Sequence, residues 1–226
     1  IETSLKHNIS KIIALSTDKA SSPINLYGAT KLCSDKLFVS ANNYSGNKKS
    51  IFSVVRYGNV MGSRGSVIKK FIEFKKMKKP IHITDLRMTR FNITLTQSVE
   101  FVESCMKNMN GGEIFVPKIK SYKITDLKQA IAPNQKIKII GTRQGEKIHE
   151  SLISSSEAPN TLEYKNYFSI IDNFIVKNKN IKKYANDLKK RKCKKMKDNF
   201  SYVSNNNKFL KVSEIKNLIR KNLEVF

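Results

Sequence analysis

The feature that most constrains this chain is a pair of short apolar runs separated by one amphipathic segment. The runs KIIALST (Lys11–Thr17) and IFSVVRYGNV (residues 51–60) are rich in β-branched residues, which is typical of strands buried on both faces of a parallel sheet. Between them, apolar or small residues recur every three or four positions over residues 26–44, which predicts a helix. A strand, a helix and a second strand in this order predict an α/β fold with a parallel sheet.

Further segments continue the alternation towards the C-terminus. Strands are expected in the apolar runs IHIT, EIFVP, KIKII and NYFSIID. Helices are expected at residues 66–79, 96–109, 124–132 and 213–223, with Thr125 and Ser213 as the N-caps of the last two. No internal repeat interrupts this pattern, and the chain is interpreted as an α/β protein throughout.

The net charge of +25 raises the question of a nucleic-acid partner. Lysines are spread along the chain, with one dense run near the C-terminus, and aromatic residues are not interleaved with that run as they are where single-stranded bases stack. The charge is therefore interpreted as a solvated basic surface, and no nucleic-acid partner is predicted. A non-catalytic basic module on a decayed enzyme scaffold, binding nucleic acid or an anionic polysaccharide, stays open as an alternative.

The rest of the composition narrows the class of protein. No apolar run approaches the roughly 20 residues of a membrane-spanning helix, so no membrane span is predicted. The N-terminus lacks the layout of a signal peptide, and the cysteines lack C-x-x-C spacing, which together predict a cytoplasmic protein. The cysteines and histidines are too dispersed to predict a metal site: Cys33, Cys105, Cys193, His7, His82 and His149.

Tyr27 and Lys31 form the candidate catalytic pair. A separation of four residues places them on one face of the predicted helix, one turn apart. An ammonium group beside a phenol stabilises the phenolate, and such a tyrosine can remove a hydroxyl proton while hydride leaves the same carbon. Because Y-x-x-x-K also occurs by chance, the pair gains its weight from the preceding strand, which ends in Ser16 and Thr17.

A strand that ends in Ser or Thr and leads into a Y-x-x-x-K helix resembles the short-chain dehydrogenase/reductase families. The phrases STDKA, PINLYGATK, RYGNVMGSRGSV, ITDLRMTRF, GGEIFVPKI and IIGTRQGEKIHE, in this order, resemble the extended branch that modifies nucleotide sugars. Within it they are similar to the polysaccharide-biosynthesis dehydratases, in particular the inverting UDP-N-acetylglucosamine 4,6-dehydratases of pseudaminic acid biosynthesis. The resemblance covers nearly the whole chain.

The resemblance implies a fold and a division of the chain. The expected fold is the C-terminal part of a Rossmann-type doubly wound parallel sheet plus a smaller α/β substrate-binding region. Residues 1–65 would be the C-terminal half of the NADP-binding domain, and residues 66–226 mostly the substrate-binding region, with some segments returning to the sheet. No G-x-G-x-x-G turn follows a strand, so the family's first part is expected to be missing and the fragment alone to be inactive.

The reaction that the resemblance implies assigns roles to four residues. It oxidises C4 of UDP-N-acetylglucosamine, eliminates water across C5 and C6, and returns hydride to C6 with inversion at C5. Tyr27 would be the base for the C4 hydroxyl, and Lys31 its partner and a ligand of the nicotinamide ribose. Asp18 would be the acid that assists water loss and Lys19 the base that takes the C5 proton. Related retaining dehydratases carry Asp–Glu here, so Asp18–Lys19 is the most discriminating dipeptide in the chain.

The remaining contacts are likewise implied by the resemblance. Cofactor contacts are expected from Leu15, Ser16, Tyr27 and Lys31, and from the turn Val60, Met61, Gly62, Ser63 and Arg64 through its backbone N–H groups. Substrate contacts are expected from Thr17, Asn59, Val67, Thr84, Arg90, Arg143 and Asn206. Arg143 would bind the pyrophosphate with two hydrogen bonds, and Arg90 would either position the uridine or brace its loop. Around Asn206 the run SYVSNNN departs from the family pattern.

The implied cofactor is NADP, with NAD as the alternative, and the implied partners are a UDP-sugar substrate and further copies of the chain in a homo-oligomer. A UDP-sugar 4-epimerase or a retaining dehydratase of the same superfamily is the enzymatic alternative. Lys19 favours the inverting dehydratase over both, because an epimerase needs no base at C5 and the retaining enzymes resemble Asp–Glu.

Overall fold

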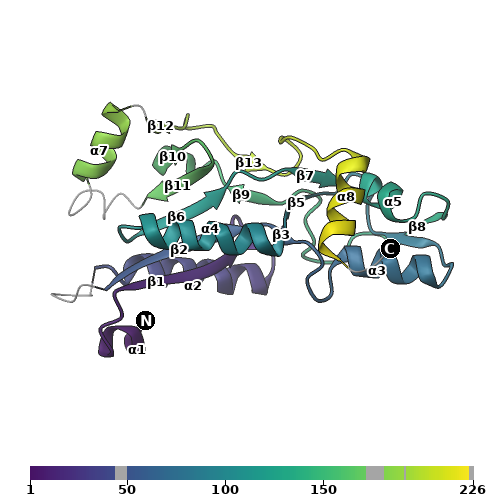
Figure 1. Ribbon diagram of the computed structural model, residues 1–226, viewed down its shortest axis with the longest axis horizontal. Coiled ribbons are helices and arrows are strands. Elements are labelled where there is room, and N and C mark those ends of the chain that lie inside the picture. Colours follow the sequence, from purple (N-terminus) through teal and green to yellow (C-terminus); the bar gives the residue numbers. More distant parts are fainter. Residues whose placement is uncertain (44–49, 172–180, 191, 224–226) are drawn as a thin grey trace. The chain divides into compact units, whose positions relative to one another are not determined.

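The computed structural model describes residues 1–43, 50–171, 181–190 and 192–223. The chain divides into two compact units, each assembled from three separate segments (Figure 1). The first unit comprises residues 1–57, 99–118 and 151–202, and the second comprises residues 58–98, 119–150 and 203–226. The predicted roles of residues 1–65 and 66–226 as cofactor and substrate regions stay predictions.

A six-stranded sheet in the order β1-β2-β6-β11-β10-β12 forms the first unit. Its members are β1 (Lys11–Thr17), β2 (Ile51–Tyr57), β6 (Glu113–Pro117), β10 (Thr161–Glu163), β11 (Tyr167–Ile171) and β12 (Lys194–Lys195). The first three strands are parallel, and the other three are antiparallel to their neighbours. The predicted parallel sheet is therefore confirmed.

Helices cover both faces of this sheet. On one face, Phe38 of α2 (Leu26–Ser40) packs edge-on against Phe52 of β2, with the ring centroids 6.2 Å apart. Val55 of β2 lies an odd number of residues further along and so faces the other side, where it packs with Cys105 of α4 (Leu95–Asn108). The unit also contains the short helices α1 (Glu2–Lys6), η1 (Asp18–Ala20), η2 (Ala158–Asn160) and α7 (Ile181–Lys189).

The second unit packs three helices and two small sheets around one core. The helices are α3 (Val67–Lys76), α5 (Ile124–Ile131) and α8 (Val212–Asn222), and the strands are β3 (Asn59–Val60), β4 (Ile81–Ile83), β5 (Thr89–Ile93), β7 (Ser121–Lys123) and β8 (Ile137–Ile139). β3 pairs parallel to β5, β5 antiparallel to β7, and β4 parallel to β8. The fully buried centre includes Phe71, Ile81, Leu127, Ile131 and Ile219. The short strand β9 (Ser151–Ile153) belongs to the first unit and pairs with β13 (Tyr202–Val203), whose first residue is the last of that unit.

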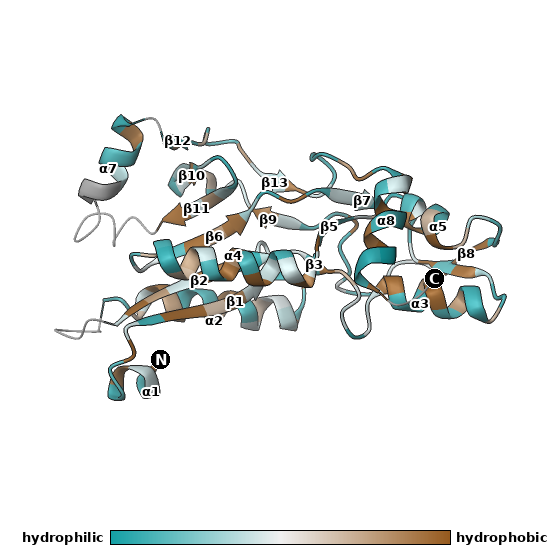
Figure 2. Cartoon of the chain, in the orientation of Figure 1, coloured by the Kyte–Doolittle hydropathy of each residue, from teal (hydrophilic) through white to brown (hydrophobic). Residues whose placement is uncertain are grey.

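Figure 2 shows β1 and β2 as largely hydrophobic, whereas α3 and α8 carry both hydrophobic and hydrophilic residues. None of the helices in the described ranges is long and apolar enough to cross a membrane.

Both predicted N-caps are wrong, because α5 and α8 begin before them. β7 runs into α5 without a loop, so that Lys123 is the cap and Thr125 lies in the first turn. At α8 the Glu214 carboxylate accepts a hydrogen bond from the backbone N–H of Lys211, 2.7 Å away, which makes Lys211, two residues before Ser213, the N-cap. The predicted helix over residues 26–44 ends at residue 40, and Tyr44 and Asp172 lie outside the described residues.

A buried ion cluster ties α2 to the sheet. Arg56 of β2 is fully buried and contacts Asp35 of α2 at 3.1 Å and Glu157 at 2.9 Å, and it donates a further hydrogen bond to the carbonyl oxygen of Leu152. Burial raises the pKa of Asp35 despite Arg56. At Glu157 burial also acts upwards, but Arg56 and the hydrogen bonds from Ser154 outweigh it and lower the pKa. The guanidinium therefore pairs with carboxylates from two other segments of the unit.

Replacing Arg56 by alanine should lower the free energy of unfolding by about 3–5 kcal/mol, because the buried carboxylate of Asp35 and the partly buried one of Glu157 lose their partner. The measurement is urea denaturation of the chain. Arg87→Ala is the matched control, since Arg87 is 72% exposed in its ion pair with Asp85 and should cost less than about 1 kcal/mol. Equal losses for the two variants would contradict a structural role of the buried cluster.

Candidate active site

The Asp18–Lys19 dipeptide lies directly after β1, in the short helix η1. Thr17 Oγ1 donates to Asp18 Oδ1 at 3.0 Å, and Lys19 Nζ donates to the same oxygen at 3.1 Å. The Asp18 side chain is 1% exposed, and its other oxygen, Oδ2, is buried without a hydrogen-bond partner among the described residues. A buried carboxylate oxygen is normally paired, so this one is an exception that calls for an explanation.

Helix α2 begins in close contact with this turn. Asn25 caps the helix by accepting a hydrogen bond from the backbone N–H of Gly28 at 2.8 Å. A Cβ atom on Gly28 would lie 2.3 Å from the carbonyl oxygen of Lys19 and 2.9 Å from Cβ of Pro23. Only glycine leaves room for this approach, which places the first turn of α2, with Tyr27, against η1.

Lys31 lies one turn further along α2 and is anchored to β1. Its Nζ donates to the carbonyl oxygen of Leu15 at 2.8 Å. Leu15 and Tyr27 are half exposed, at 50% and 55%. The first unit thus brings together the predicted residues Leu15, Ser16, Thr17, Asp18, Lys19, Tyr27 and Lys31 at the carboxyl end of β1, where doubly wound sheets bind ligands.

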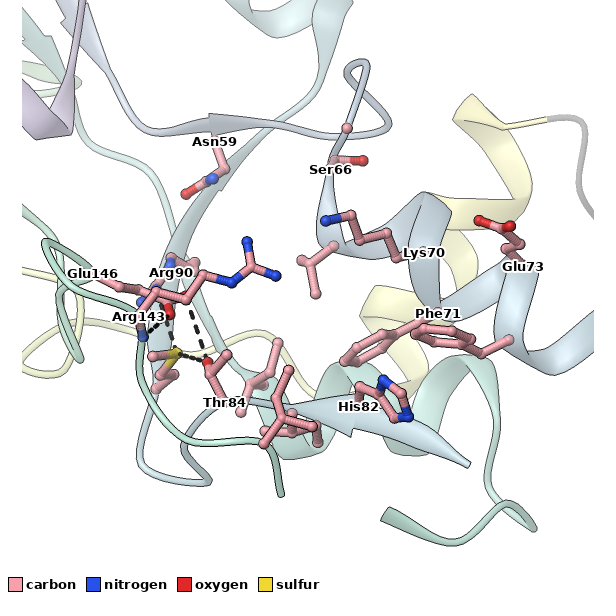
Figure 3. Close-up of a pocket in the computed structure, with 17 residues that line it drawn as sticks. Asn59, Ser66, Lys70, Phe71, Glu73, His82, Thr84, Arg90, Arg143 and Glu146 are labelled. Atoms are coloured by element: carbon pink, nitrogen blue, oxygen red, sulfur yellow. Dashed lines mark hydrogen bonds and ion pairs between the residues drawn. The ribbon is translucent and has the colours of Figure 1, made fainter. Parts of the chain in front are cut away.

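A cavity of about 530 Å³ lies in the second unit. Its lining includes five predicted residues, Asn59, Val67, Thr84, Arg90 and Arg143, and further polar residues, Ser66, Lys70, Glu73, His82 and Glu146. Figure 3 shows Ser66 and Lys70 on the α3 side of the cavity, across from Thr84, Arg90 and Arg143. This volume is within the range of small-molecule sites, and the lining includes three basic side chains, those of Lys70, Arg90 and Arg143.

Arg90 makes the contacts of a brace. Its guanidinium donates to the carbonyl oxygens of Thr89, Lys147 and Ile148 at 2.8, 3.0 and 2.9 Å. The Glu146 carboxylate lies 3.8 Å from it. These bonds join β5 to the segment that follows Glu146, while a contact between Arg90 and the uridine stays a prediction.

Glu146, Lys70 and Glu73 were not found from the sequence. Glu146 Oε2 accepts the backbone N–H of Arg143 at 3.2 Å, and its Oε1 accepts the Thr84 hydroxyl at 3.5 Å, so it holds two predicted residues in place. A signal for the α3 residues was present, because Ser66, Lys70 and Glu73 are spaced by four and three and share one helix face.

Two predicted groups do not join the lining of this cavity. The turn Val60–Arg64 uses the N–H of Met61 for the carbonyl oxygen of Ile93 and the N–H of Ser63 for that of Val60, at 2.8 and 3.2 Å. These two N–H groups are therefore bonded within the chain and the Met61 side chain is buried in the core, while contact between this turn and a cofactor stays a prediction. Asn206 is exposed in a turn, where its N–H donates to Val203.

In the first unit, β1 of the parallel sheet ends at the Asp18–Lys19 turn and is followed by the Y-x-x-x-K helix α2. This arrangement defines the unit as part of a Rossmann-type short-chain dehydrogenase/reductase. More narrowly, residues 1–172 match the family of polysaccharide biosynthesis proteins, and the chain belongs to that family. The resemblance noted in the sequence is thereby confirmed.

Individual relatives include both enzyme classes weighed above. The chain is 53% identical, over 208 residues, to the inverting UDP-N-acetylglucosamine 4,6-dehydratase of Campylobacter jejuni, covering 92% of this chain and 62% of that protein. It is 39% identical to the UDP-glucose 4-epimerase of Rickettsia bellii, covering 94% and 62%. The X-ray structure of Pen from Bacillus thuringiensis is similar over 100% of this chain and 66% of that one, with 32% identity and a TM-score of 0.85. The chain thus spans less than two thirds of the curated relatives it matches.

Replacing Gly28 by alanine should force α2 away from the Asp18–Lys19 turn and lower the free energy of unfolding by about 1–3 kcal/mol, because the added methyl group meets backbone. Urea denaturation measures the change. Cys33→Ala, which trims an exposed side chain of the same helix, should stay within about 0.5 kcal/mol. A Gly28→Ala variant as stable as the parent would disprove the close approach.

His149 should make the second unit sensitive to mild acid. Burial, Arg90 and Arg87 lower its pKa from the ordinary value of 6.5, outweighing Asp85. Because the folded state disfavours the charged ring, the stabilisation is complete above pH 6.5 and is lost as pH falls from there through the lowered pKa. His149→Gln should flatten the fall in melting temperature between about pH 7 and pH 5. An unchanged slope would show that other groups control it.

Proposed function

We propose that this chain is part of an inverting UDP-N-acetylglucosamine 4,6-dehydratase. The observation that carries the proposal is the Asp18–Lys19 turn held against the helix of Tyr27 and Lys31, since this set supplies one acid and two bases. The 53% identity to the Campylobacter jejuni enzyme supports it.

The residues around β1 fit a nicotinamide cofactor. Leu15 and Tyr27 are half exposed, and the ammonium group of Lys31 is fixed at the strand end by the Leu15 carbonyl oxygen. These residues would hold the nicotinamide and its ribose. When bound, the cofactor would accept hydride from C4 of the sugar and supply it again at C6.

The side chains of the first unit would move the protons of the reaction. Tyr27 removes the proton of the C4 hydroxyl, and Lys31 stabilises the resulting phenolate. The ketone at C4 makes the C5 proton acidic, Lys19 takes that proton, and Asp18 protonates the leaving C6 hydroxyl. Lys19 Nζ and Asp18 Oδ1 are 3.1 Å apart, so the base and the acid assigned to the elimination lie side by side.

The cavity of the second unit would bind the uridine diphosphate. Arg143 and Lys70 offer positive charge to the pyrophosphate, and a guanidinium can bind phosphate oxygens with two parallel hydrogen bonds. Glu146 keeps the Arg143 segment in position through the Arg143 N–H, and Thr84 lies beside it. Asn59 adds an amide whose buried Oδ1 has no partner among the described residues, and this oxygen can accept a sugar hydroxyl.

A 4-epimerase is the second candidate, favoured by the Rickettsia bellii relative at 39% identity. It would need Tyr27 and Lys31 but no base at C5. Lys19, whose amine is held at the buried carboxylate of Asp18, has no task in that reaction, and this favours the dehydratase.

Several finer points belong to the same proposal. The cofactor is NADP, with NAD as the alternative, and the protein is a cytoplasmic homo-oligomer whose product enters pseudaminic acid synthesis. These points rest on the family resemblance. The chain by itself is inactive, because it contains no G-x-G-x-x-G turn to bind the cofactor's pyrophosphate.

Lys19→Ala should separate the two chemical steps. In the complete reading frame with UDP-N-acetylglucosamine, we expect release of the 6-deoxy product to fall about 10²–10⁴-fold, because the base at C5 is lost, while reduction of the bound cofactor in the first turnover persists. Stopped-flow absorbance of the reduced cofactor and chromatography of the product measure the two. Tyr27→Phe should abolish both signals.

Lys36→Ala is the matched control, since Lys36 is an exposed lysine on the same helix α2 and should leave both signals unchanged. Full product release by the Lys19→Ala variant would contradict the role of Lys19. A C4 epimer as the only product of the parent enzyme would instead establish the 4-epimerase.

A further inference from the structure

An exposed basic and apolar surface lies at one end of the second unit, formed by the C-terminal end of α3 and by β8 (Figure 1). We call it the α3–β8 surface, and its members are Lys75, Lys76, Met77, Lys78, Lys79, Lys136, Ile137, Lys138 and Ile139, all of them exposed. The two segments are tied together. Gln135 Nε2 donates to the carbonyl oxygens of Phe74 and Lys79, both at 3.0 Å, and the N–H of Ile81 donates to Lys136.

Exposed apolar side chains on this surface lie beside buried residues of the core. β4 and β8 are parallel, with Ile81 opposite Ile137 and Ile83 opposite Ile139, so the four side chains face the same side of the sheet. Ile81 and Ile83 are buried, whereas Ile137 and Ile139 are 40% and 61% exposed. Met77 is also half exposed. The hydrophobic core therefore covers the apolar face of β4 but leaves Ile137 and Ile139 of β8 exposed.

The segments that carry these side chains have charge of one sign, with Lys136 and Lys138 on the opposite face of the exposed strand β8 from Ile137 and Ile139. Residues 74–81 and 133–140 contain six lysines and no aspartate or glutamate. A second copy of the chain pairing along β8 would bring Lys136 and Lys138 against their own equivalents, and like charges placed opposite each other on adjoining strands are destabilising. The partner that complements this surface is therefore anionic, and it accepts apolar side chains between its charges.

We propose that the α3–β8 surface docks on an anionic phospholipid bilayer. The lysine ammonium groups bind lipid phosphates, and Met77, Ile137 and Ile139 enter the boundary between headgroups and acyl chains, which is the pattern of a protein that lies on a membrane. A nucleic acid would use the lysines but leave the isoleucines without a contact. The proposal does not depend on the reaction proposed above. The α3–β8 surface borders the cavity described above, because the cavity-lining residues Phe74, His82 and Ile140 are next to it in sequence.

The test is sedimentation of the chain with phosphatidylglycerol/phosphatidylcholine vesicles and with vesicles of phosphatidylcholine alone. We expect binding only to the anionic vesicles, weakening with added salt. The triple variant Lys76→Glu/Lys79→Glu/Lys138→Glu should weaken that binding at least about tenfold, because each basic residue at such a surface contributes separately. Lys189→Glu/Lys190→Glu/Lys197→Glu, which makes the same change in net charge at exposed lysines of the first unit, should weaken it less than about twofold.

A second pair of variants tests the apolar contribution. Ile137→Ser/Ile139→Ser should weaken vesicle binding severalfold, and Val99→Ser/Met106→Ser, at exposed apolar positions of α4, should not. Equal losses for the two lysine triples would show attraction by net charge alone and overturn the proposal. So would failure of the parent chain to bind the anionic vesicles. Loss of heparin retention in the first triple, with vesicle binding intact, would assign the surface to a polyanion and overturn it as well.

Discussion

The contact between Gly28 and the carbonyl oxygen of Lys19 is the constraint on which the candidate catalytic set depends. No side-chain atom fits between the start of α2 and the turn after β1, so the helix that carries Tyr27 and the turn that carries Asp18 are held together by backbone packing. The same helix is fixed at two further points. Lys31 reaches back to the Leu15 carbonyl oxygen, and Asp35 pairs with the buried Arg56. A reaction that needs an acid and two bases in fixed relation requires this kind of rigid support.

The parts of the fold that could be predicted are those with a strong local period. The β-branched runs at β1 and β2 are strands in the predicted places, and the spacing of Tyr27 and Lys31 does put them on one helix. The predicted N-caps of α5 and α8 were wrong for a physical reason that residue propensities do not include. α5 continues directly from β7, and α8 starts early because Glu214 caps the N–H of Lys211, so Thr125 and Ser213 have no capping role.

The two groups of site residues differ in how far the sequence reveals them. Asp18, Lys19, Tyr27 and Lys31 lie within one turn and one helix, so a local motif contains them. The cavity of the second unit is assembled from α3, β4, β5 and the segment around Arg143, which are far apart in sequence. The spacing of residues along the chain does not predict that these segments come together in the fold. Glu146, whose carboxylate positions Arg143, was not predicted for that reason. Arg90, which was expected either to position the uridine or to brace its loop, donates to three carbonyl oxygens, and these contacts fit the second alternative.

The central claim is that Lys19 serves as the base at C5 of a nucleotide sugar, and the stereochemistry at C5 tests it most directly. The measurement is proton NMR of UDP-N-acetylglucosamine in D₂O with the complete reading frame. We expect a new C6 methyl signal, deuterium at C5, and C5 coupling constants of the inverted sugar. A methyl product that keeps its original configuration at C5 would contradict the role assigned to Lys19, even though the elimination itself would stand.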